Sequence, residues 1–168
     1  MPRILGFPNP VNEVAARSVA GGVALLSVTT LVLSVTAGHA WLWISAALAY
    51  GFVARVLAGP KLSPLGQLAT RVLAPQIGHE KLVPGPPKRF AQGMGAAMTT
   101  LAAVLALAGD DTATAVVLGL VLVAATLESV FAICLGCHVF AALMRVGLIP
   151  ESACAACADI RLRQHQAA

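Results

Sequence analysis

The chain has 168 residues, of which 58% are hydrophobic and only 11% are charged. A soluble domain averages about 45–50% apolar and about 25% charged residues, so this composition excludes an ordinary water-soluble enzyme. Intrinsic disorder is excluded as well, because disordered chains combine low hydrophobicity with high charge. The length suits one domain, and we interpret residues 1–168 as a single integral membrane domain.

Four stretches are apolar enough to cross a bilayer as helices, which takes about 20 mostly apolar residues each. They cover residues 18–37, 41–58, 90–108 and 112–135. The ten prolines all lie outside these stretches, as expected because lipid cannot replace the hydrogen bond that proline removes. The first stretch is longer than the core of a signal peptide, about 7–15 residues, so we expect an uncleaved anchor. The sequence therefore predicts an all-α, polytopic membrane protein with four transmembrane helices.

The basic residues predict the orientation of these spans. All eleven Lys and Arg residues fall in the N-terminal segment, in the loop of residues 59–89, in the C-terminal tail, or at the adjoining ends of spans. The two opposite turns carry only His39, Asp110 and Asp111. By the positive-inside rule, both termini and the central loop are expected in the cytoplasm. The net charge of +4 then fits attraction to anionic lipid, and the sequence shows no nucleic-acid signature.

The segments that flank the spans have their own signals. Asn9-Pro10 is typical of a helix N-cap followed by proline at the first position. The stretch from Ser63 to Pro75 predicts a short helix on the membrane surface, with apolar residues on one face. The following residues, Pro84–Arg89 (PGPPKR), predict a stiff extended connector.

Two charged residues lie inside the predicted spans, Arg55 and Glu128. An intramembrane charge is costly and usually has a partner. Counted from the outer ends of their helices at 1.5 Å per residue, they lie about 21 and 24 Å deep, so we expect an intramembrane ion pair between them. A small transporter that uses this pair is a weaker alternative, because the chain lacks the broken helices in two matching halves that are typical of such proteins.

All four cysteines lie in the last 35 residues, as two C-x-x-C pairs: Cys134/Cys137 and Cys154/Cys157. Sixteen residues separate the pairs, which fits the spacing of zinc sites. The predicted orientation places both pairs on the reducing side, where permanent structural disulfides are disfavoured. These four residues are the candidate redox pairs and also the candidate metal ligands.

Three chemistries compete for these residues. Four thiolates could bind one zinc ion tetrahedrally. Alternatively, the pairs could carry out thiol–disulfide or persulfide exchange, with one sulfur attacking and its neighbour resolving. Residues Cys134–His138 (CLGCH) also spell the covalent haem-attachment motif, but that attachment is expected on the outer side, so we discount haem.

The choice between a zinc site and two separate dithiols depends on whether the fourth span breaks, which the sequence does not decide. If the fourth span and the tail are regular helices joined by a turn at 145–150, the four sulfurs do not converge on one ion. Convergence requires the fourth span to break near Gly136, which glycine permits. His138 is a further candidate ligand or proton acceptor, although a solvated histidine at the interface is the simpler interpretation.

Several stretches together resemble a known family. They are Phe7–Arg17, Ser63–Pro75, Arg89–Gly93 and Cys134–Ile160. They resemble the bacterial "domain of unknown function 4395" family of small membrane proteins, common in actinobacteria. The resemblance implies a bacterial plasma-membrane location and a four-span layout, and it implies no settled activity.

The sequence leaves three hypotheses and does not decide whether the protein is an enzyme. The first is a membrane thiol protein that handles reducing equivalents or sulfur at the cytoplasmic face, with a cytoplasmic thiol or sulfur-transfer protein as partner. The second is a structural or assembly protein whose cysteine-bearing tail (residues 134–163) is clamped by zinc. The third is the transporter. In each case the lipid bilayer is the surrounding medium, and the tail ends in a short cytoplasmic helix.

Overall fold

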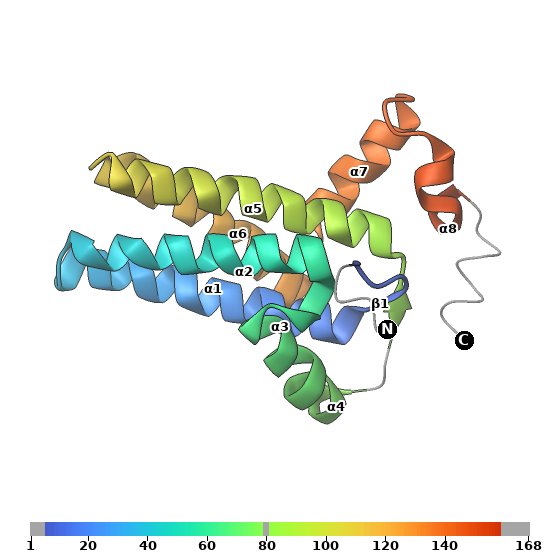
Figure 1. Cartoon of the computed structure of the whole chain (residues 1–168), viewed down its shortest axis with the longest axis horizontal. Coiled ribbons are helices and arrows are strands. Elements are labelled where there is room, and N and C mark those ends of the chain that lie inside the picture. The colour runs from blue at the N-terminus through green and yellow to red at the C-terminus, as the bar shows by residue number, and fades with distance from the viewer. Residues whose placement is uncertain (1–5, 79–80, 159–168) are drawn as a thin grey trace.

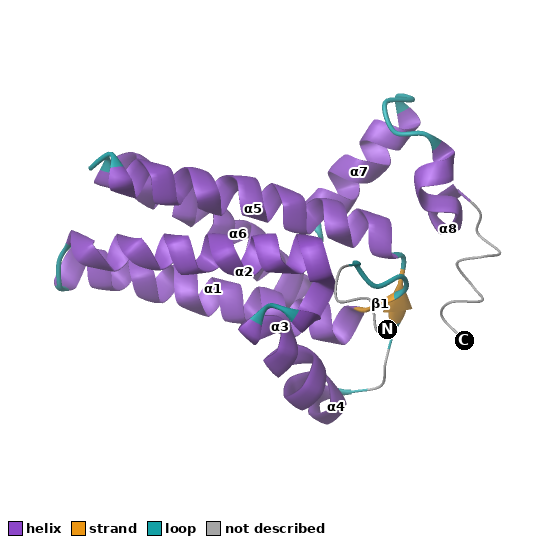
Figure 2. Ribbon diagram, viewed as in Figure 1, coloured by secondary structure: helices purple, strands orange, loops and turns teal. Residues whose placement is uncertain are grey.

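The computed structural model describes residues 6–78 and 81–158, and most of these are helical (Figure 2). Four helices run side by side along the molecule (Figure 1): α1 (Glu13–Thr36), α2 (Ile44–Ala58), α5 (Gly85–Leu107) and α6 (Asp111–Phe131). Within the described ranges, four helical runs are long and apolar enough to cross a membrane, the second of them spanning His39–Ile77. The predicted all-α fold with four such helices is confirmed.

The connections divide between the two ends of the bundle. A 3-10 turn, η1 (His39–Trp43), joins α1 to α2, and a short turn joins α5 to α6 at the same end. There His39 Nδ1 lies 3.1 Å from Asp111 Oδ2. The central loop and the tail lie at the other end, with the N-terminal segment, as Figure 1 shows. The structure therefore places the N-terminal segment, the central loop and the tail together at one end of the bundle, as the charge pattern predicts.

Two asparagine side chains accept hydrogen bonds from N–H groups at the starts of two different helices. Asn12 is the N-cap of α1, and its side chain accepts from the N–H groups of Val14 and Ala15 at 2.9 and 3.3 Å. Asn9, which the sequence suggests as that cap, instead accepts from the N–H of Gly85 at 2.9 Å. The prediction for Asn9 is therefore wrong about the helix, because the N-terminal segment folds over the start of α5.

A small two-stranded sheet fixes this N-terminal segment. Strand β1 (Val11–Asn12) pairs antiparallel with β2 (Leu82–Val83), with Val11 opposite Val83. An ion pair at 2.7 Å between Glu13 and Lys81 extends the link. The strands are only two residues long each, so no alternating pattern marks them in the sequence.

The central loop is mostly helical, as predicted, but it continues past Pro75. After the short turn η2 (Gly59–Lys61), the chain forms one run of helix made of α3 (Pro64–Leu68), η3 (Ala69–Leu73) and α4 (Ala74–Ile77). Ser63 caps it, accepting from the N–H of Gly66 at 3.2 Å. Segment η3 is a π-type turn, in which the N–H of Ala74 bonds the carbonyl of Ala69.

The third spanning helix begins earlier than the sequence predicts. Residues 84–89 were expected to form an extended connector, but α5 already starts at Gly85. Pro86 and Pro87 lie in its first turn, where the missing N–H groups would have no helical partner anyway. This correction matters for the site, because it places Lys88 on a helix of the bundle.

The fourth spanning helix ends at Phe131, four residues before the predicted end, and the chain then bends. Ala132 adopts a left-handed conformation with φ 58°. A separate helix, α7 (Leu135–Arg145), leaves the bundle at an angle (Figure 1). After a turn, η4 (Glu151–Cys154) and α8 (Ala155–Ala158) form the short tail helix. The predicted continuation of that tail to residue 163 lies outside the described residues.

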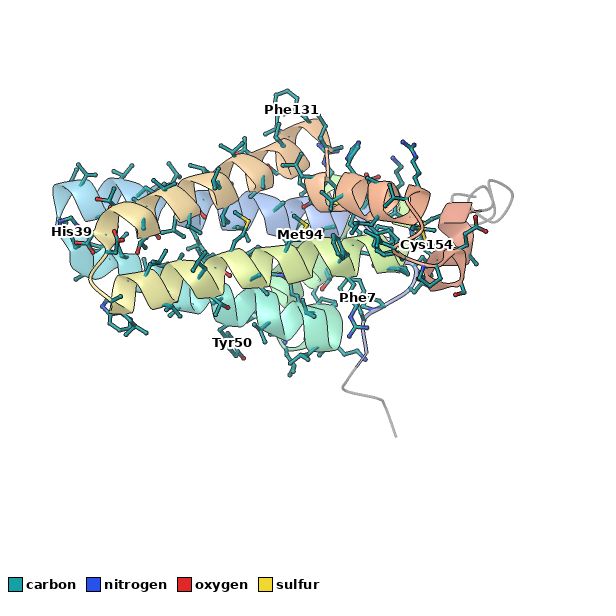
Figure 3. All side chains as sticks on the ribbon, turned by 90° about the horizontal axis from the view of Figure 1, so that it is seen from above. Phe7, His39, Tyr50, Met94, Phe131 and Cys154 are labelled. Atoms are coloured by element: carbon teal, nitrogen blue, oxygen red, sulfur yellow. A yellow bond between two sulfur atoms is a disulfide. The ribbon has the colours of Figure 1, made fainter. Side chains whose placement is uncertain are left out.

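The bundle buries several small polar side chains together with its apolar core and exposes many large apolar side chains. The small hydroxyl residues Thr30, Thr99 and Thr114 are fully buried, and each donates to a carbonyl four residues earlier. Large apolar side chains cover the outside; Val35, for example, is 86% exposed. Figure 3 shows Phe131, another of these, pointing away from the bundle. This distribution fits lipid as the surrounding solvent, because a helix in lipid gains nothing by hiding apolar side chains.

Helix packing within the bundle follows a ring in which α2 lies on α5, α5 on α6, and α6 on α1. Close approach of α2 and α5 depends on Gly95, where a Cβ atom would overlap the ring of Phe52. The methionine side chain of Met94 lies between the helices, as Figure 3 shows. Helix α5 contacts α2 and α6, and it also contacts α7, so it contributes to most of the site described below.

Candidate dithiol site

Both C-x-x-C pairs lie at the starts of helices at one end of the molecule. Cys134 is the N-cap of α7, and its sulfur accepts from the N–H of Cys137 at 3.3 Å. Cys154 ends η4, directly before α8. Each pair forms a disulfide, with a Cα–Cα distance of 5.2 Å in both. The structure therefore describes the oxidised form of two separate dithiols.

The two members of each pair differ in exposure. Cys134 and Cys154 are buried, whereas Cys137 and Cys157 are half-buried. In thiol–disulfide exchange the more accessible sulfur is the one that a partner can attack, and the other acts within the pair. The N-terminus of α7 also places backbone N–H groups beside Cys134, an arrangement that stabilises a thiolate on that sulfur after reduction.

One open cavity of about 590 Å³ borders both pairs. Cys134 and Cys137 line it from α7, and Cys157 lines it from α8. Its polar lining consists of five residues: Glu13, Lys88, His138, Arg145 and Glu151. The cavity therefore brings the two dithiols to a common space, together with groups that can bind anions or accept protons.

The four sulfurs do not converge on a point. The fourth span does break near Gly136, at residues 132–134, and yet the sulfurs bond within their own pairs. Among the described residues, no group of three or more His, Cys, Asp or Glu side chains is placed to hold a metal ion. In this arrangement the four cysteines do not offer the tetrahedral ligand set that the zinc hypothesis requires.

Gly136 has a packing role instead. A Cβ atom at this position would lie 2.5 Å from the Cα atom of Ala91 on α5. The ring of Phe140 also meets that of Phe90 edge-on, with centroids 5.6 Å apart. These contacts fix the first turns of α7 against α5, and they hold Cys134 and Cys137 at the end of the bundle.

The intramembrane charges have different partners from those predicted. Glu128 accepts a charged hydrogen bond of 2.8 Å from Lys88 Nζ on α5, and both side chains are almost fully buried. The residue in direct contact with Glu128 is therefore Lys88, and not Arg55 as the sequence predicts. The physical reason is the early start of α5, which brings Lys88 to the depth of Glu128.

Arg55 is held by neutral groups. Its Nε donates to Gln92 Oε1 at 2.7 Å, and its Nη1 donates to Ser63 Oγ at 3.0 Å. The guanidinium also lies over the ring of Phe52, 4.4 Å from the centroid. Arg55 is 5% exposed, so these contacts replace part of the water around a buried charge, while Nη2 has no hydrogen-bond partner among the described residues.

His138 lies at the rim of the cavity with a defined hydrogen bond. Its Nδ1 is 2.9 Å from the carbonyl oxygen of Cys134. A carbonyl only accepts, so this contact places the proton on Nδ1 and leaves the lone pair of Nε2 to accept a proton in the neutral ring. The residue is exposed, as a solvated interfacial histidine should be.

A second cavity, of about 310 Å³, lies inside the bundle between α1, α5 and α6. Its walls are almost entirely apolar, with Gln92 and Glu128 as the polar lining residues. Cys134 lines this cavity as well as the open one. Cys134 thus lies between the polar cavity at the end of the bundle and the apolar cavity within it.

The sequence identifies the four cysteines as site residues but does not identify Lys88 and Gln92. Lys88 lies in the predicted loop, and Gln92 is an uncharged residue inside a predicted span. A signal for Lys88 was present in Pro86-Pro87, since prolines are common in the first turn of a helix.

Fold and site together define a helical protein that has four helices long and apolar enough to cross a membrane and carries two C-x-x-C disulfides at one end. The chain belongs to the family described as "Domain of unknown function (DUF4395)", which matches residues 11–145. The match includes Cys134 and Cys137 and ends before Cys154 and Cys157, so the second pair lies outside the shared region. None of the curated proteins and none of the solved structures matches this chain.

Proposed function

We propose that the protein is a membrane-bound thiol–disulfide oxidoreductase, in which two dithiols exchange reducing equivalents at the cytoplasmic end of the bundle. The observation that carries the proposal is the common cavity, which Cys134, Cys137 and Cys157 all line. A purely structural role for two disulfides would not need their accessible members to face the same open space.

The exchange can be written as a sequence of two attacks. With the tail pair reduced, the thiolate of Cys157 attacks the sulfur of Cys137, forming a Cys137–Cys157 bond and releasing Cys134 as a thiolate. Cys154 then loses its proton and attacks Cys157, which closes the Cys154–Cys157 disulfide and releases Cys137. Two electrons pass from the tail pair to the pair on α7. Release of Cys134 is favoured because the helix N-terminus stabilises its thiolate.

The location and partner follow from the charge pattern. The basic residues concentrate at the end that carries the cysteines, which favours a cytoplasmic position in a bacterial plasma membrane. In that compartment a soluble dithiol or sulfur-transfer protein is the natural electron donor, because the cytoplasm keeps thiols reduced. The tail pair is the entry point that we propose, since it lies at the end of η4 and in α8, beyond α7 at the end of the molecule (Figure 1).

A cross-linking experiment tests the exchange directly. In the double variant Cys134→Ser/Cys154→Ser, only the two accessible cysteines remain. Mild oxidation should join Cys137 to Cys157 within one chain, as detected by mass spectrometry after proteolysis. The matched control, Cys137→Ser/Cys157→Ser, keeps only the buried members and should form no such bond.

Two results would contradict the proposal. Absence of the Cys137–Cys157 bond in the first variant would show that the pairs do not meet. One zinc ion per chain in the purified native protein, with thiols that do not react with a soluble disulfide, would support the structural zinc hypothesis instead.

A further inference from the structure

The apolar cavity beside Cys134 has a size and lining that suit a ligand. A volume of about 310 Å³ falls at the lower end of small-molecule sites, which run from about 300 to 1,000 Å³ and are mostly apolar with a few placed polar groups. Here the polar groups are the amide of Gln92 and the carboxylate of Glu128. Such a space fits one ring system with polar substituents.

The cavity opens towards the lipid-facing side of the bundle. Leu120 and Val123 both line it, and each is 56% exposed on the outer face of α6. A ligand that dissolves in the bilayer could therefore enter from the side, between apolar residues.

Cys134 connects this ligand space to the dithiol chemistry. It lines both cavities, so a group bound inside the bundle would lie against the sulfur that the exchange reaction leaves reduced. Reoxidation of the Cys134/Cys137 pair requires an acceptor of two electrons and two protons. An acceptor that is lipid-soluble, planar and able to accept hydrogen bonds can enter from the bilayer, fits the volume of the cavity and can take up two electrons and two protons.

We infer that this cavity binds the head group of a membrane quinone, which reoxidises the Cys134/Cys137 dithiol. In the reaction two S–H bonds break and one S–S bond forms, while two O–H bonds form on the quinone, giving the quinol. Electrons and protons balance without a further oxidant. The inference rests on the proposed function, and it names the acceptor for the electrons that enter at the tail.

Gln92 and Glu128 have different roles at the quinone site: Gln92 donates a hydrogen bond, and Glu128 exchanges protons. Arg55 occupies the oxygen of Gln92, so the amide N–H₂ group is what Gln92 can offer to a quinone oxygen. Glu128 lines the inner cavity, and its partner Lys88 lines the open one. This hydrogen-bonded pair therefore joins the two spaces beside Cys134, along a path on which protons can be exchanged.

The test uses the full-length protein in lipid nanodiscs, reduced with a small dithiol that is then removed. A short-chain ubiquinone analogue is added, and quinone loss and free thiols are measured together. We expect one quinone reduced per disulfide formed, and therefore two per chain when both pairs are reoxidised. In Ala124→Phe, which fills the cavity, the rate should fall about tenfold, as expected for the loss of about 1.4 kcal/mol of binding. The matched control Val116→Phe, on the exposed side of the same helix, should keep the native rate.

The outcomes separate the two proposals. If the native protein exchanges with a soluble disulfide but does not reduce the quinone, or if Ala124→Phe reduces it as fast as the native chain, the quinone inference is overturned and the oxidoreductase stands. If the cysteines exchange with no reagent, both fall. Should Ala124→Phe fail to fold, a photoreactive quinone on the native chain decides: attachment to α5 or α6 near Gln92 supports the site, and attachment elsewhere refutes it.

Discussion

Lys88 on α5 donates a charged hydrogen bond of 2.8 Å to Glu128 on α6, at the point where the two helices approach the cysteine end of the bundle. The side chains are only 9% and 15% exposed, so both charges are largely shielded from bulk water. The pair fixes α5 against α6 beside both cavities. Its integrity therefore bears on the stability of the fold and on the chemistry of Cys134.

Breaking this pair from one side should be costly. Lys88→Met leaves a buried carboxylate without its partner, and we expect a loss of about 3 kcal/mol in the free energy of unfolding. The double variant Lys88→Met/Glu128→Gln should recover most of that loss, because the unpaired charge is gone. Thermal unfolding in detergent measures both.

A comparison for this prediction is the pair of Glu13 and Lys81, in which the carboxylate is as buried as that of Glu128 but the lysine is exposed. The side chain of Lys81 is 68% exposed, so Lys81→Met should cost no more than about 1 kcal/mol. Equal losses for Lys88→Met and Lys81→Met would refute the importance that we assign to burial.

Gly136 should tolerate no side chain. In Gly136→Ala the new Cβ meets the backbone of Ala91, which cannot move aside, so we expect destabilisation of about 1–3 kcal/mol and a displaced α7. Unfolding measurements should be combined with proteolysis of the tail, which a displaced α7 accelerates. Gly119→Ala is the control: it meets no atom within 4 Å, and the helix should become slightly more stable. A neutral Gly136→Ala would mean that α7 is not packed on α5.

Ser63 serves two groups, and its loss should affect both. Ser63→Ala removes the cap of the surface helix and the acceptor for Arg55 Nη1, so we expect a loss of about 2 kcal/mol. Ser152 is exposed in η4, and Ser152→Ala should change stability by less than about 0.5 kcal/mol. If the two variants unfold alike, Arg55 does not depend on Ser63.

After reduction, the cysteines should react with alkylating reagents in a defined order. Cys137 and Cys157 are half-buried and line the open cavity, so they should be modified before Cys134 and Cys154. Timed labelling with mass spectrometry of tail peptides measures the order. The reverse order would remove the assignment of Cys137 and Cys157 as the attacking pair. The same reagent, applied to intact cells and to inverted vesicles, reports which side of the membrane the cysteines face.

The spans could be predicted because the information is local. Some twenty apolar residues without proline define a spanning helix wherever they occur, and the ends observed at Thr36 and Leu107 each lie within one residue of the predictions. The start of α5 was missed because Pro86 and Pro87 are compatible both with a connector and with a first helical turn. The structure selects the second, since Asn9 from a distant segment caps the helix.

The site depends on contacts that no local pattern contains. Alanine has no tendency to end a helix, so the residue type at Ala132 gives no sequence signal that predicts the bend after α6. The bend accompanies the packing of Gly136 on Ala91, which is a contact between distant segments. For the same reason the partner of Glu128 could not be predicted, because Lys88 was counted with the loop. The C-x-x-C spacing located the reactive residues, but their common cavity follows only from the folded chain.

The bond between Asn9 and Gly85 joins residues 76 positions apart, and it makes the beginning of the chain a part of the site. A fusion tag or a truncation that disturbs Asn9 would loosen the first turn of α5, three residues from Lys88. Such a change would reach the walls of both cavities without touching a cysteine. Fusions at the two ends of the chain are therefore not equivalent, and loss of activity from an N-terminal fusion would reflect the geometry of α5.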